Sequence, residues 1–310
     1  MNNLEKSILT TLSFFDIFDY PLTLVEIWQW LYVYPELKNL RTEEQIKIVN
    51  VQNTLDKSDY LKQKLEVKNG FYFLHGRHGL VEKRMERYNI AERKYQKALK
   101  IIKILRLIPY VKMMAVCNTL AYSNARDESD IDLFIICEKG HLWKTRFLIS
   151  GFLKLFNLRP TESQTKDKIC ASFFLSEDSL DVSNLAIDDD VYLKYWITQI
   201  YPVYDDGIYN KFLMANNWVK NAIQNNFFNQ PTLRRQVSQS RLKSIFRIFF
   251  NILSEEYCRN YQWKILPDNL RQIVNKDTRV VMNDHVLKFH DNDKRDSFRD
   301  IFRQKLQGIL

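Results

Sequence analysis

Two aspartates separated by a single residue are the first side chains in this sequence whose type and spacing point to chemistry. Asp130 and Asp132 follow a short stretch of small and polar residues and precede the apolar run LFII at 133–136. In an extended strand, side chains two positions apart point to the same face, so we expect both carboxylates to project together. Two ionised carboxylates side by side repel each other unless a cation sits between them. The pair therefore predicts a site for a divalent metal ion.

Magnesium is the ion that we expect at this pair. It is a hard cation that prefers oxygen ligands and keeps coordination sites for the phosphates of a substrate. The preceding stretch contains Asn118, Thr119 and Ser123, whose backbone amides and side chains we expect to hold phosphate oxygens. A simpler alternative is that the aspartates form local ion pairs with Arg126 or Lys112.

The stretch NTLAYSNARDESDIDLFI at 118–135 resembles the motif of the nucleotidyltransferase superfamily. In that motif a Gly-Ser pair begins a short helix and loop that end in Ser-Asp-x-Asp. Asn118 and Thr119 stand where the Gly-Ser pair is usual, and asparagine tolerates unusual backbone dihedrals better than most residues. Ser129 matches the serine before the first aspartate, and Asp130 and Asp132 match the two metal-binding aspartates. The likeness is closest to the minimal nucleotidyltransferases of bacteria and archaea.

The resemblance implies an activity. It implies a magnesium-dependent enzyme that moves a nucleoside monophosphate from a nucleoside triphosphate, with ATP the expected donor, to a hydroxyl group and releases pyrophosphate. Asp130 and Asp132 would hold the metal, and Thr119 and Ser129 would contact phosphates. The nucleotidyltransferase superfamily commonly uses a third carboxylate on a later strand as the base. The expected strand ICASFFL at 169–175 contains none, and the substitutes at or beyond its ends are Asp167, Glu177, Asp178 and Asp181. The alternative is a catalytically degenerate module that senses nucleotide and binds nucleic acid.

Residues 1–79 predict a winged helix-turn-helix. Apolar residues at helical spacing indicate a helix over 4–18, and the capping-box spacings of Thr23 with Glu26 and of Thr42 with Gln45 indicate helices over 24–32 and 42–55. The pair Asn69 and Gly70 then predicts a β-hairpin, which would be the wing. The segment FFDIFDYPLT at 14–23 and the winged helix also resemble those of uncharacterised bacterial proteins, in which a nucleotidyltransferase domain follows such a module. The lysines expected to touch nucleic-acid phosphates are Lys47, Lys57, Lys62, Lys64 and Lys68. A protein-contact or substrate-positioning module is the other interpretation.

The remaining chain divides into two further predicted regions. Residues 80–190 would form the α/β nucleotidyltransferase domain with a small mixed sheet, led by a basic helix over 80–108 whose Arg93, Lys97 and neighbouring cations either face water or follow phosphates. We expect strands at 111–116 and 168–175 and a helix over 142–156. Residues 191–310 predict a helical C-terminal region, with helices over 192–204, 210–223, 242–262 and 295–310. The expected fold class is α+β.

Composition limits the class of protein. The chain has 310 residues, 45% of them hydrophobic and 27% charged, and a formal net charge of +9, which favours an anionic partner such as nucleotide or nucleic acid. No stretch resembles a signal peptide or a membrane span, so we expect a cytoplasmic protein without a membrane partner. The four cysteines form no CxxC pair, which favours buried thiols over a zinc site or disulfides.

His285 and His290 lie near three aspartates in the sequence, Asp284, Asp291 and Asp293. These residues could form a second metal cluster, and turn formation explains them equally well.

Overall fold

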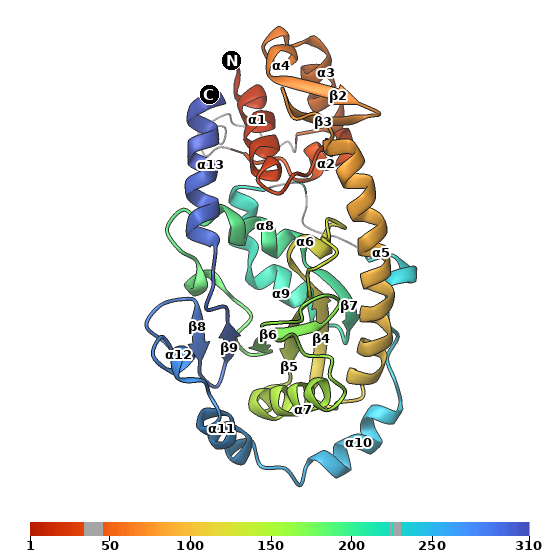
Figure 1. Ribbon diagram of the computed structural model, residues 1–310, viewed down its shortest axis with the longest axis vertical. Helices are drawn as coiled ribbons and strands as arrows, with labels where there is room; N and C mark the ends of the chain where they lie inside the picture. Colours follow the sequence, from red (N-terminus) through yellow and green to blue (C-terminus); the bar gives the residue numbers. More distant parts are fainter. Residues whose placement is uncertain (34–45, 224, 226–230, 310) are drawn as a thin grey trace.

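The computed structural model has a mixed α+β architecture, which confirms the expected fold class. It describes residues 1–33, 46–223, 225 and 231–309. The molecule is elongated, with a small helical and β unit at one end, a six-stranded sheet in the middle, and helices at the other end (Figure 1). Within the described residues, none of the helices has the length and apolar character needed to cross a membrane.

The N-terminal unit begins with the expected helix and ends with the expected hairpin. Asn2 and Thr23 each form a capping box, at the starts of α1 and α2 respectively. Asn69 and Gly70 both have positive φ, 53° and 77°, as a two-residue hairpin turn requires. The expected helix start at Thr42 lies outside the described residues. The elements are α1 (Asn3–Asp16), β1 (Leu22–Thr23), α2 (Leu24–Gln29), α3 (Ile48–Lys57), α4 (Asp59–Lys64), β2 (Leu65–Lys68) and β3 (Phe71–Leu74), with sheet order β1-β3-β2.

The long helix α5 (Leu80–Leu105) connects this unit to the central sheet. It runs along one side of the molecule from the N-terminal unit to the opposite end (Figure 1). Two arginines near the N-terminal end of α5 contact the N-terminal unit. Arg84 binds the Glu26 carboxylate at 2.7 Å, and Arg87 donates to the Phe18 carbonyl oxygen at 2.8 Å. These contacts attach the N-terminal unit to α5 and remove two positive charges from any nucleic-acid surface.

The central sheet has six strands in the order β7-β4-β5-β6-β9-β8. Strands β5 and β6 are parallel, and the other neighbours are antiparallel. The strands expected around 111–116, 133–136 and 168–175 are all present. The strands and the helices between them are β4 (Val111–Val116), α6 (Asn118–Ala121), β5 (Ile131–Cys137), α7 (Leu142–Leu155), β6 (Ile169–Ser176), β7 (Tyr201–Asp205), β8 (Val280–Met282) and β9 (Val286–Phe289).

The two faces of the sheet are buried under different helices. On one face Phe134 and Phe173 pack in a cluster that includes α1 and two further helices, α8 (Val191–Gln199) and α9 (Tyr209–Ala215). On the other face Ile135 and Phe174 pack in a cluster that includes α5 and α7. The alternation follows from the period-2 geometry of strands. One apolar cluster thus extends from the N-terminal unit to the sheet.

The expectation of a helical region over 191–310 is wrong in part. Three strands of the central sheet, β7, β8 and β9, come from this region, so the chain beyond residue 190 completes the sheet. The expected helix over 192–204 ends at Gln199, because the sequence YPVYD continues as β7. The expected helix over 242–262 is two helices, α10 (Leu242–Phe250) and α11 (Glu255–Lys264), followed by the short helix α12 (Asp268–Arg271).

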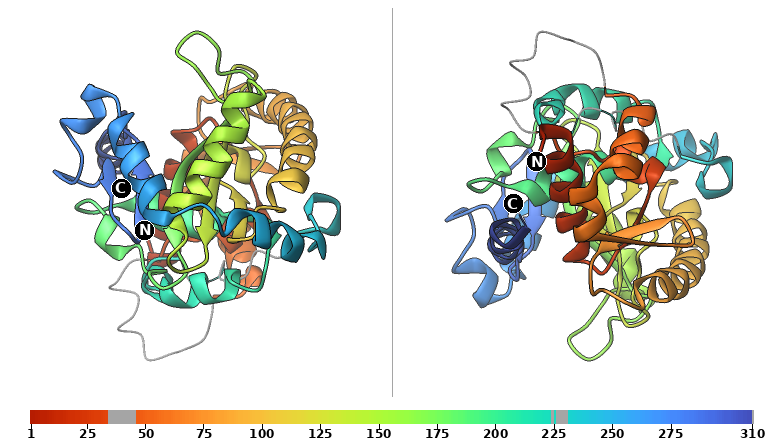
Figure 2. Two further views of the ribbon diagram at one scale, coloured as in Figure 1. Left: turned by 90° about the horizontal axis from the view of Figure 1, so that it is seen from below. Right: turned by 90° about the horizontal axis from the view of Figure 1, so that it is seen from above.

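The two ends of the chain lie together. The last helix, α13 (Arg295–Ile309), runs beside α1, and Figures 1 and 2 both show the two termini close to each other. The Tyr60 hydroxyl donates to the Ile309 carbonyl oxygen at 2.8 Å, and the Lys305 ammonium binds the Asp16 carboxylate at 2.6 Å. The C-terminal helix therefore packs on the N-terminal unit.

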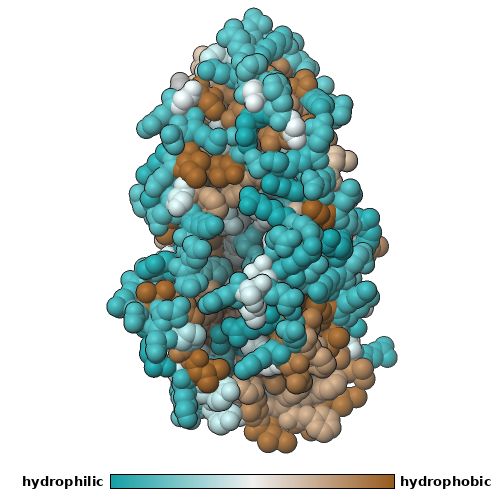
Figure 3. Space-filling model, viewed as in Figure 1, coloured by the Kyte–Doolittle hydropathy of each residue, from teal (hydrophilic) through white to brown (hydrophobic). Residues whose placement is uncertain are grey.

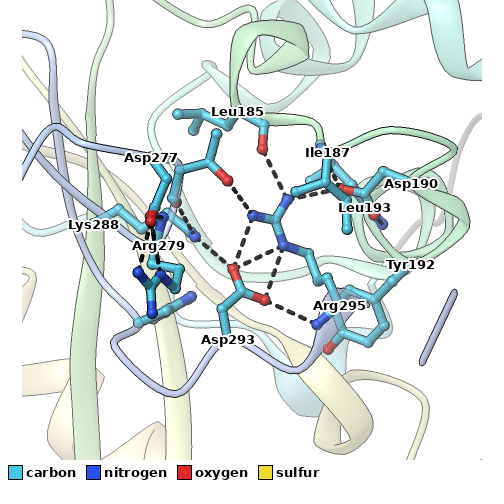
Figure 4. Close-up of polar contacts among 12 residues, drawn as sticks. Leu185, Ile187, Asp190, Tyr192, Leu193, Asp277, Arg279, Lys288, Asp293 and Arg295 are labelled. Atoms are coloured by element: carbon cyan, nitrogen blue, oxygen red, sulfur yellow. Dashed lines mark hydrogen bonds and ion pairs between the residues drawn. The ribbon is translucent and has the colours of Figure 1, made fainter. Parts of the chain in front are cut away.

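A buried ion network fixes the start of α13 (Figure 4). Arg295 donates to the carboxylates of Asp190 at 2.7 Å and Asp293 at 2.9 Å, and to the Leu185 carbonyl oxygen at 2.8 Å. Lys288 on β9 binds the same Asp293 at 3.1 Å. Because Asp190 is also the N-cap of α8, the network ties α8, β9 and α13 to one another.

We expect Arg295→Met to lower the free energy of unfolding by about 3 kcal/mol or more, because it leaves Asp190 and Asp293 without their shared cation in a buried position. Urea denaturation monitored by circular dichroism measures the change. The control is Arg279→Met, which removes a surface ion pair with Asp277 at 2.7 Å and should cost far less stability, because exposed ion pairs are screened by solvent. Equal losses in the two variants would contradict the assignment of Arg295 as the centre of the network.

Candidate functional site

Asp130, Asp132 and Cys170 form a compact group of potential ligands. Asp132 is the second residue of β5, and its register partner on the parallel strand β6 is Cys170. Register partners on adjacent strands point to the same face of a sheet. One ligand atom from each of Asp130, Asp132 and Cys170 lies within 4.8 Å of the others. The sequence predicted the two aspartates, and the strand pairing adds the thiol.

Cys170 lies on β6, the later strand on which the resemblance implies a third carboxylate. The four acidic residues considered as substitutes lie elsewhere and have other partners. Asp167 binds Lys94 at 2.8 Å, Glu177 accepts from the Lys139 amide at 3.2 Å, Asp178 accepts from Ser176 at 2.6 Å, and Asp181 accepts from the Ser183 amide at 2.8 Å. Sequence reasoning missed Cys170 because it looked for an acidic residue.

The electrostatics of the pair favour a bound cation. Burial and the negative charge of Asp130 raise the pKa of Asp132 to about 7, and burial also raises the pKa of Asp130. Among the described residues, neither aspartate forms an ion pair with Arg126 or Lys112, the alternative role expected for them. Within the described part of the chain, no cation forms a direct ion pair with either carboxylate, although the charge of Lys94 partly offsets the rise in the pKa of Asp130.

The donor set determines which metal ions fit. Two carboxylates suit Mg²⁺, which takes oxygen ligands. The thiol of Cys170 is a softer donor, and a set of two carboxylates and one sulfur also suits a borderline ion such as Zn²⁺. The aspartates therefore fit the expected magnesium, and Cys170 extends the range of ions that the site can hold.

Asn118 holds Asp132 in place. Its Nδ2 donates to Asp132 Oδ2 at 2.8 Å, and its Oδ1 accepts from the Tyr192 hydroxyl at 3.2 Å and from Trp196 Nε1 at 3.1 Å. Asn118 has a φ of +57°, a left-handed conformation that glycine or asparagine adopts most readily. An asparagine at this position thus keeps the backbone turn and adds a hydrogen bond to the metal-site carboxylate.

Ser129, Ser123 and Thr119, the other residues expected to contact phosphate, lie in three different environments. The Ser129 hydroxyl donates to the Arg126 carbonyl oxygen at 2.9 Å, immediately before Asp130 in the chain. The Ser123 hydroxyl accepts from Arg235 at 3.2 Å. Thr119 lines a small internal void beside Asn118, whereas neither Thr119 nor Ser123 lines the larger cavity described below. The structure thus brings Asn118, Asp130 and Asp132 together and leaves Ser123 in contact with Arg235.

Lys94 supports the loop before Asp130 and was missed at the sequence level. This lysine of α5 has a fully buried side chain. Its ammonium donates to the Ser129 carbonyl oxygen at 2.6 Å, to the Asp127 carbonyl oxygen at 3.1 Å and to Asp167 at 2.8 Å. The signal was present in the sequence, because Lys94 lies on the same helical stripe as the buried Ala91 and Ala98. A lysine within an apolar stripe indicates a buried charge with specific partners.

A cavity of about 350 Å³ opens beside Asp132 and Cys170. Its volume lies in the range of small-molecule sites. Asp132, Cys170 and Ser172 form the part that belongs to the sheet, and the aromatic side chains of Trp196 and Phe298 come from α8 and α13. The cavity therefore joins Asp132 and Cys170 to a space lined by both aromatic and charged side chains.

The polar groups on the cavity wall come from the C-terminal region. His290 Nε2 lies 2.9 Å from the Ser172 hydroxyl, and burial together with the positive charge of Lys288 lowers the pKa of His290 to about 3. Lys294 is exposed at the same wall, and the described residues include no ion-pair partner for it. His285 lies 3.4 Å from Asp178 instead. His285 and His290 thus have separate partners, which does not match a second metal cluster.

Comparison of the chain with models of known protein families, with curated proteins and with solved structures found no match.

We expect Lys94→Met to lower the free energy of unfolding by about 3 kcal/mol, because Asp167 and two backbone carbonyl groups lose their shared donor. The matched control is Lys100→Met on the same helix, where the lysine is exposed and the change should be below about 0.5 kcal/mol. Denaturant titration of both variants gives the comparison. A stability loss at Lys94 no larger than at Lys100 would refute this role.

The raised pKa of Asp132 predicts a pH dependence of stability without metal. Between about pH 4 and 7 the folded protein keeps a proton on Asp132 that the unfolded chain has released, so the folded state loses relative stability as the pH rises through this window. We expect the metal-free protein to lose about 3 kcal/mol more than Asp132→Asn over this window. Denaturant titrations at a series of pH values measure both proteins. The same change of stability with pH in both proteins would contradict the predicted pKa shift.

Bound metal should also stabilise the fold. Millimolar Mg²⁺ or Mn²⁺ at pH 7.5 should raise the free energy of unfolding of the unsubstituted protein and leave that of Asp132→Asn unchanged.

Proposed function

We propose that this protein binds a nucleoside triphosphate with a divalent metal ion and transfers its nucleoside monophosphate group to a hydroxyl acceptor. The observation that carries the proposal is the group of Asp130, Asp132 and Cys170 beside a cavity of about 350 Å³. Partly buried carboxylates with raised pKa values in a concave site are typical of functional sites. Magnesium is the expected ion, and ATP is the expected nucleotide.

Each residue of the site has a specific role in this proposal. Asp130 and Asp132 hold the metal, which when bound would offset the negative charge of the phosphates. Asn118 orients Asp132, and Lys94 fixes the loop that carries Asp130. The nucleoside would occupy the aromatic cavity beside Trp196.

The transfer follows the usual course of an in-line displacement at phosphorus. The oxygen of the acceptor hydroxyl forms a bond to the α-phosphorus and its proton passes to solvent water, while the bond from that phosphorus to the bridging oxygen breaks and pyrophosphate leaves. The chain's part is to align the donor and to keep the two carboxylates on one side of the α-phosphate, since positioning and electrostatic stabilisation dominate the catalysis of such reactions.

The second candidate is a nucleotide-sensing module that binds but does not transfer. The observation that favours it is Cys170, because a thiol stands where the resemblance implies a carboxylate base. The order α1, β1, α2, α3, α4, β2, β3 with the sheet β1-β3-β2 supports including a winged helix in either proposal. Binding of nucleic acid by that unit and by α5 stays a prediction.

We expect the protein with ATP labelled at the α-phosphate and Mg²⁺ or Mn²⁺ to release pyrophosphate and transfer label to an acceptor, and Asp130→Asn and Asp132→Asn to lower the rate at least about 100-fold. Pyrophosphate release is measured with a coupled assay, and binding of a nonhydrolysable ATP analogue is measured by calorimetry. The control is Glu128→Gln, which changes an exposed carboxylate in the same loop.

The outcomes separate the two candidates. Metal-dependent binding of the analogue that Asp132→Asn abolishes, without pyrophosphate release from ATP, would favour the sensing module. No metal-dependent binding of nucleotide by the unsubstituted protein, or equal behaviour of the Asp130, Asp132 and Glu128 variants, would overturn both.

A further inference from the structure

Helix α10 carries an apolar face that points away from the protein. Its sequence LKSIFRIFF is strongly amphipathic, yet none of its residues is buried. The residues of the outward face, which extends to the turn after the helix, are exposed by more than half: Leu242 by 53%, Ile245 by 54%, Ile248 by 72%, Phe249 by 65% and Ile252 by 89%. We call these five residues the α10 ridge. Exposed apolar groups of this kind mark interaction sites.

The face of α10 that is attached to the protein carries Lys243 and Arg247 together with the partly buried Phe250, which packs against the core. The Lys243 ammonium donates to the Val111 carbonyl oxygen at 2.6 Å and binds Asp206 at 3.1 Å. The Arg247 guanidinium binds Glu138 at 3.1 Å. At 3.6 residues per turn, positions 243 and 247 lie opposite the α10 ridge. Specific ion pairs thus hold the helix with its apolar face outward, the reverse of the usual surface helix.

The α10 ridge lies at the end of the molecule opposite the N-terminal unit. Figures 1 and 2 show α7, α10 and the C-terminal end of α5 together at this end, and apolar side chains gather there in Figure 3. Leu155 and Phe156, at the end of α7, are exposed by 79% and 58%. The ridge is carried by a helix that projects from the end of the protein.

Free positive charge accompanies the apolar groups. Four cations on these elements are exposed, and the described part of the chain holds no ion-pair partner for any of them: Lys100 and Lys103 on α5, Lys154 on α7, and Arg241 just before α10. The whole chain has a net charge of +9. A second copy of the chain would bring the same positive charge against this end, whereas an anionic surface would be attracted to it.

We infer that the α10 ridge binds the surface of an anionic phospholipid bilayer. A helix of this kind lies in the plane of the membrane, with its apolar face buried about 5–10 Å below the headgroups and with cations near the anionic lipids. This peripheral mode needs no spanning helix. It revises the expectation of no membrane partner, which considered only spanning and signal segments. The inference does not depend on the proposed nucleotidyl transfer.

Sedimentation with vesicles tests the inference on the full chain. Vesicles of phosphatidylglycerol and phosphatidylcholine should bind the protein, and vesicles of phosphatidylcholine alone should bind it at least about tenfold more weakly. The double variant Ile248→Glu with Phe249→Glu should reduce binding to the anionic vesicles at least about tenfold, because two charges cannot enter the apolar layer. Lys100→Gln and Lys103→Gln should each weaken binding about fivefold at low salt.

The matched control is the double variant Val25→Glu with Val67→Glu. It adds the same charge at two apolar residues of the N-terminal unit, which are 54% and 61% exposed. Its binding to the anionic vesicles should stay within about twofold of that of the unsubstituted protein. Circular dichroism checks the fold of both double variants, and Ile252→Glu alone provides a second, milder probe.

Three results would overturn the inference: no binding of the unsubstituted protein to anionic vesicles, equal loss in the two double variants, or a dimer in solution that only the α10 variant dissociates. The last would show that a second copy covers the ridge. Nucleotide binding by the α10 variant should be unchanged, so this test stands apart from that of the metal site.

Discussion

The repulsion between the carboxylates of Asp130, in the loop before β5, and Asp132, at the start of β5, is the constraint around which the centre of this protein is organised. Asp130 and Asp132 cannot both be ionised at low cost in a partly buried position without a positive partner. The groups that touch them are neutral or act on the backbone: Asn118 donates an amide hydrogen to Asp132, and Lys94 holds the loop through carbonyl oxygens. Among the described residues, the protein thus supplies hydrogen bonds to this pair and to its loop but no direct ion pair.

Buried cations hold the structure together at several points. Lys94 joins α5 to the loop before β5, Arg295 joins α13 to α8, and Arg235 stacks on Tyr95 and donates to Ser123. Each replaces its lost hydration with carboxylates or carbonyl oxygens, as a buried charge requires. The net charge of +9 therefore does not translate directly into a surface for phosphates, because part of the positive charge is internal.

The site also depends on the far end of the chain. Trp196 and Tyr192 on α8 donate to Asn118, and the cavity beside Asp132 is completed by residues of β9 and α13. The same segments are tied to one another by the Arg295 network and to the N-terminal unit by the packing of α13 on α1. Residues more than 150 positions apart thus form one site, so the C-terminal region is part of the candidate site.

The sequence by itself determined the features that depend on neighbours along the chain. The capping boxes of α1 and α2, the Asn69 and Gly70 turn, the strands around Asp130 and Asp132, and the left-handed tolerance of Asn118 follow from local geometry and local hydrogen bonds. Tertiary structure alone decided the rest. The pairing of β6 with β5 selected Cys170, the short strands β7, β8 and β9 found partners far away in sequence, and α10 turned its polar face inward toward Asp206 and Glu138. These outcomes depend on register and on distant ion pairs, and a single sequence does not encode either in a local pattern.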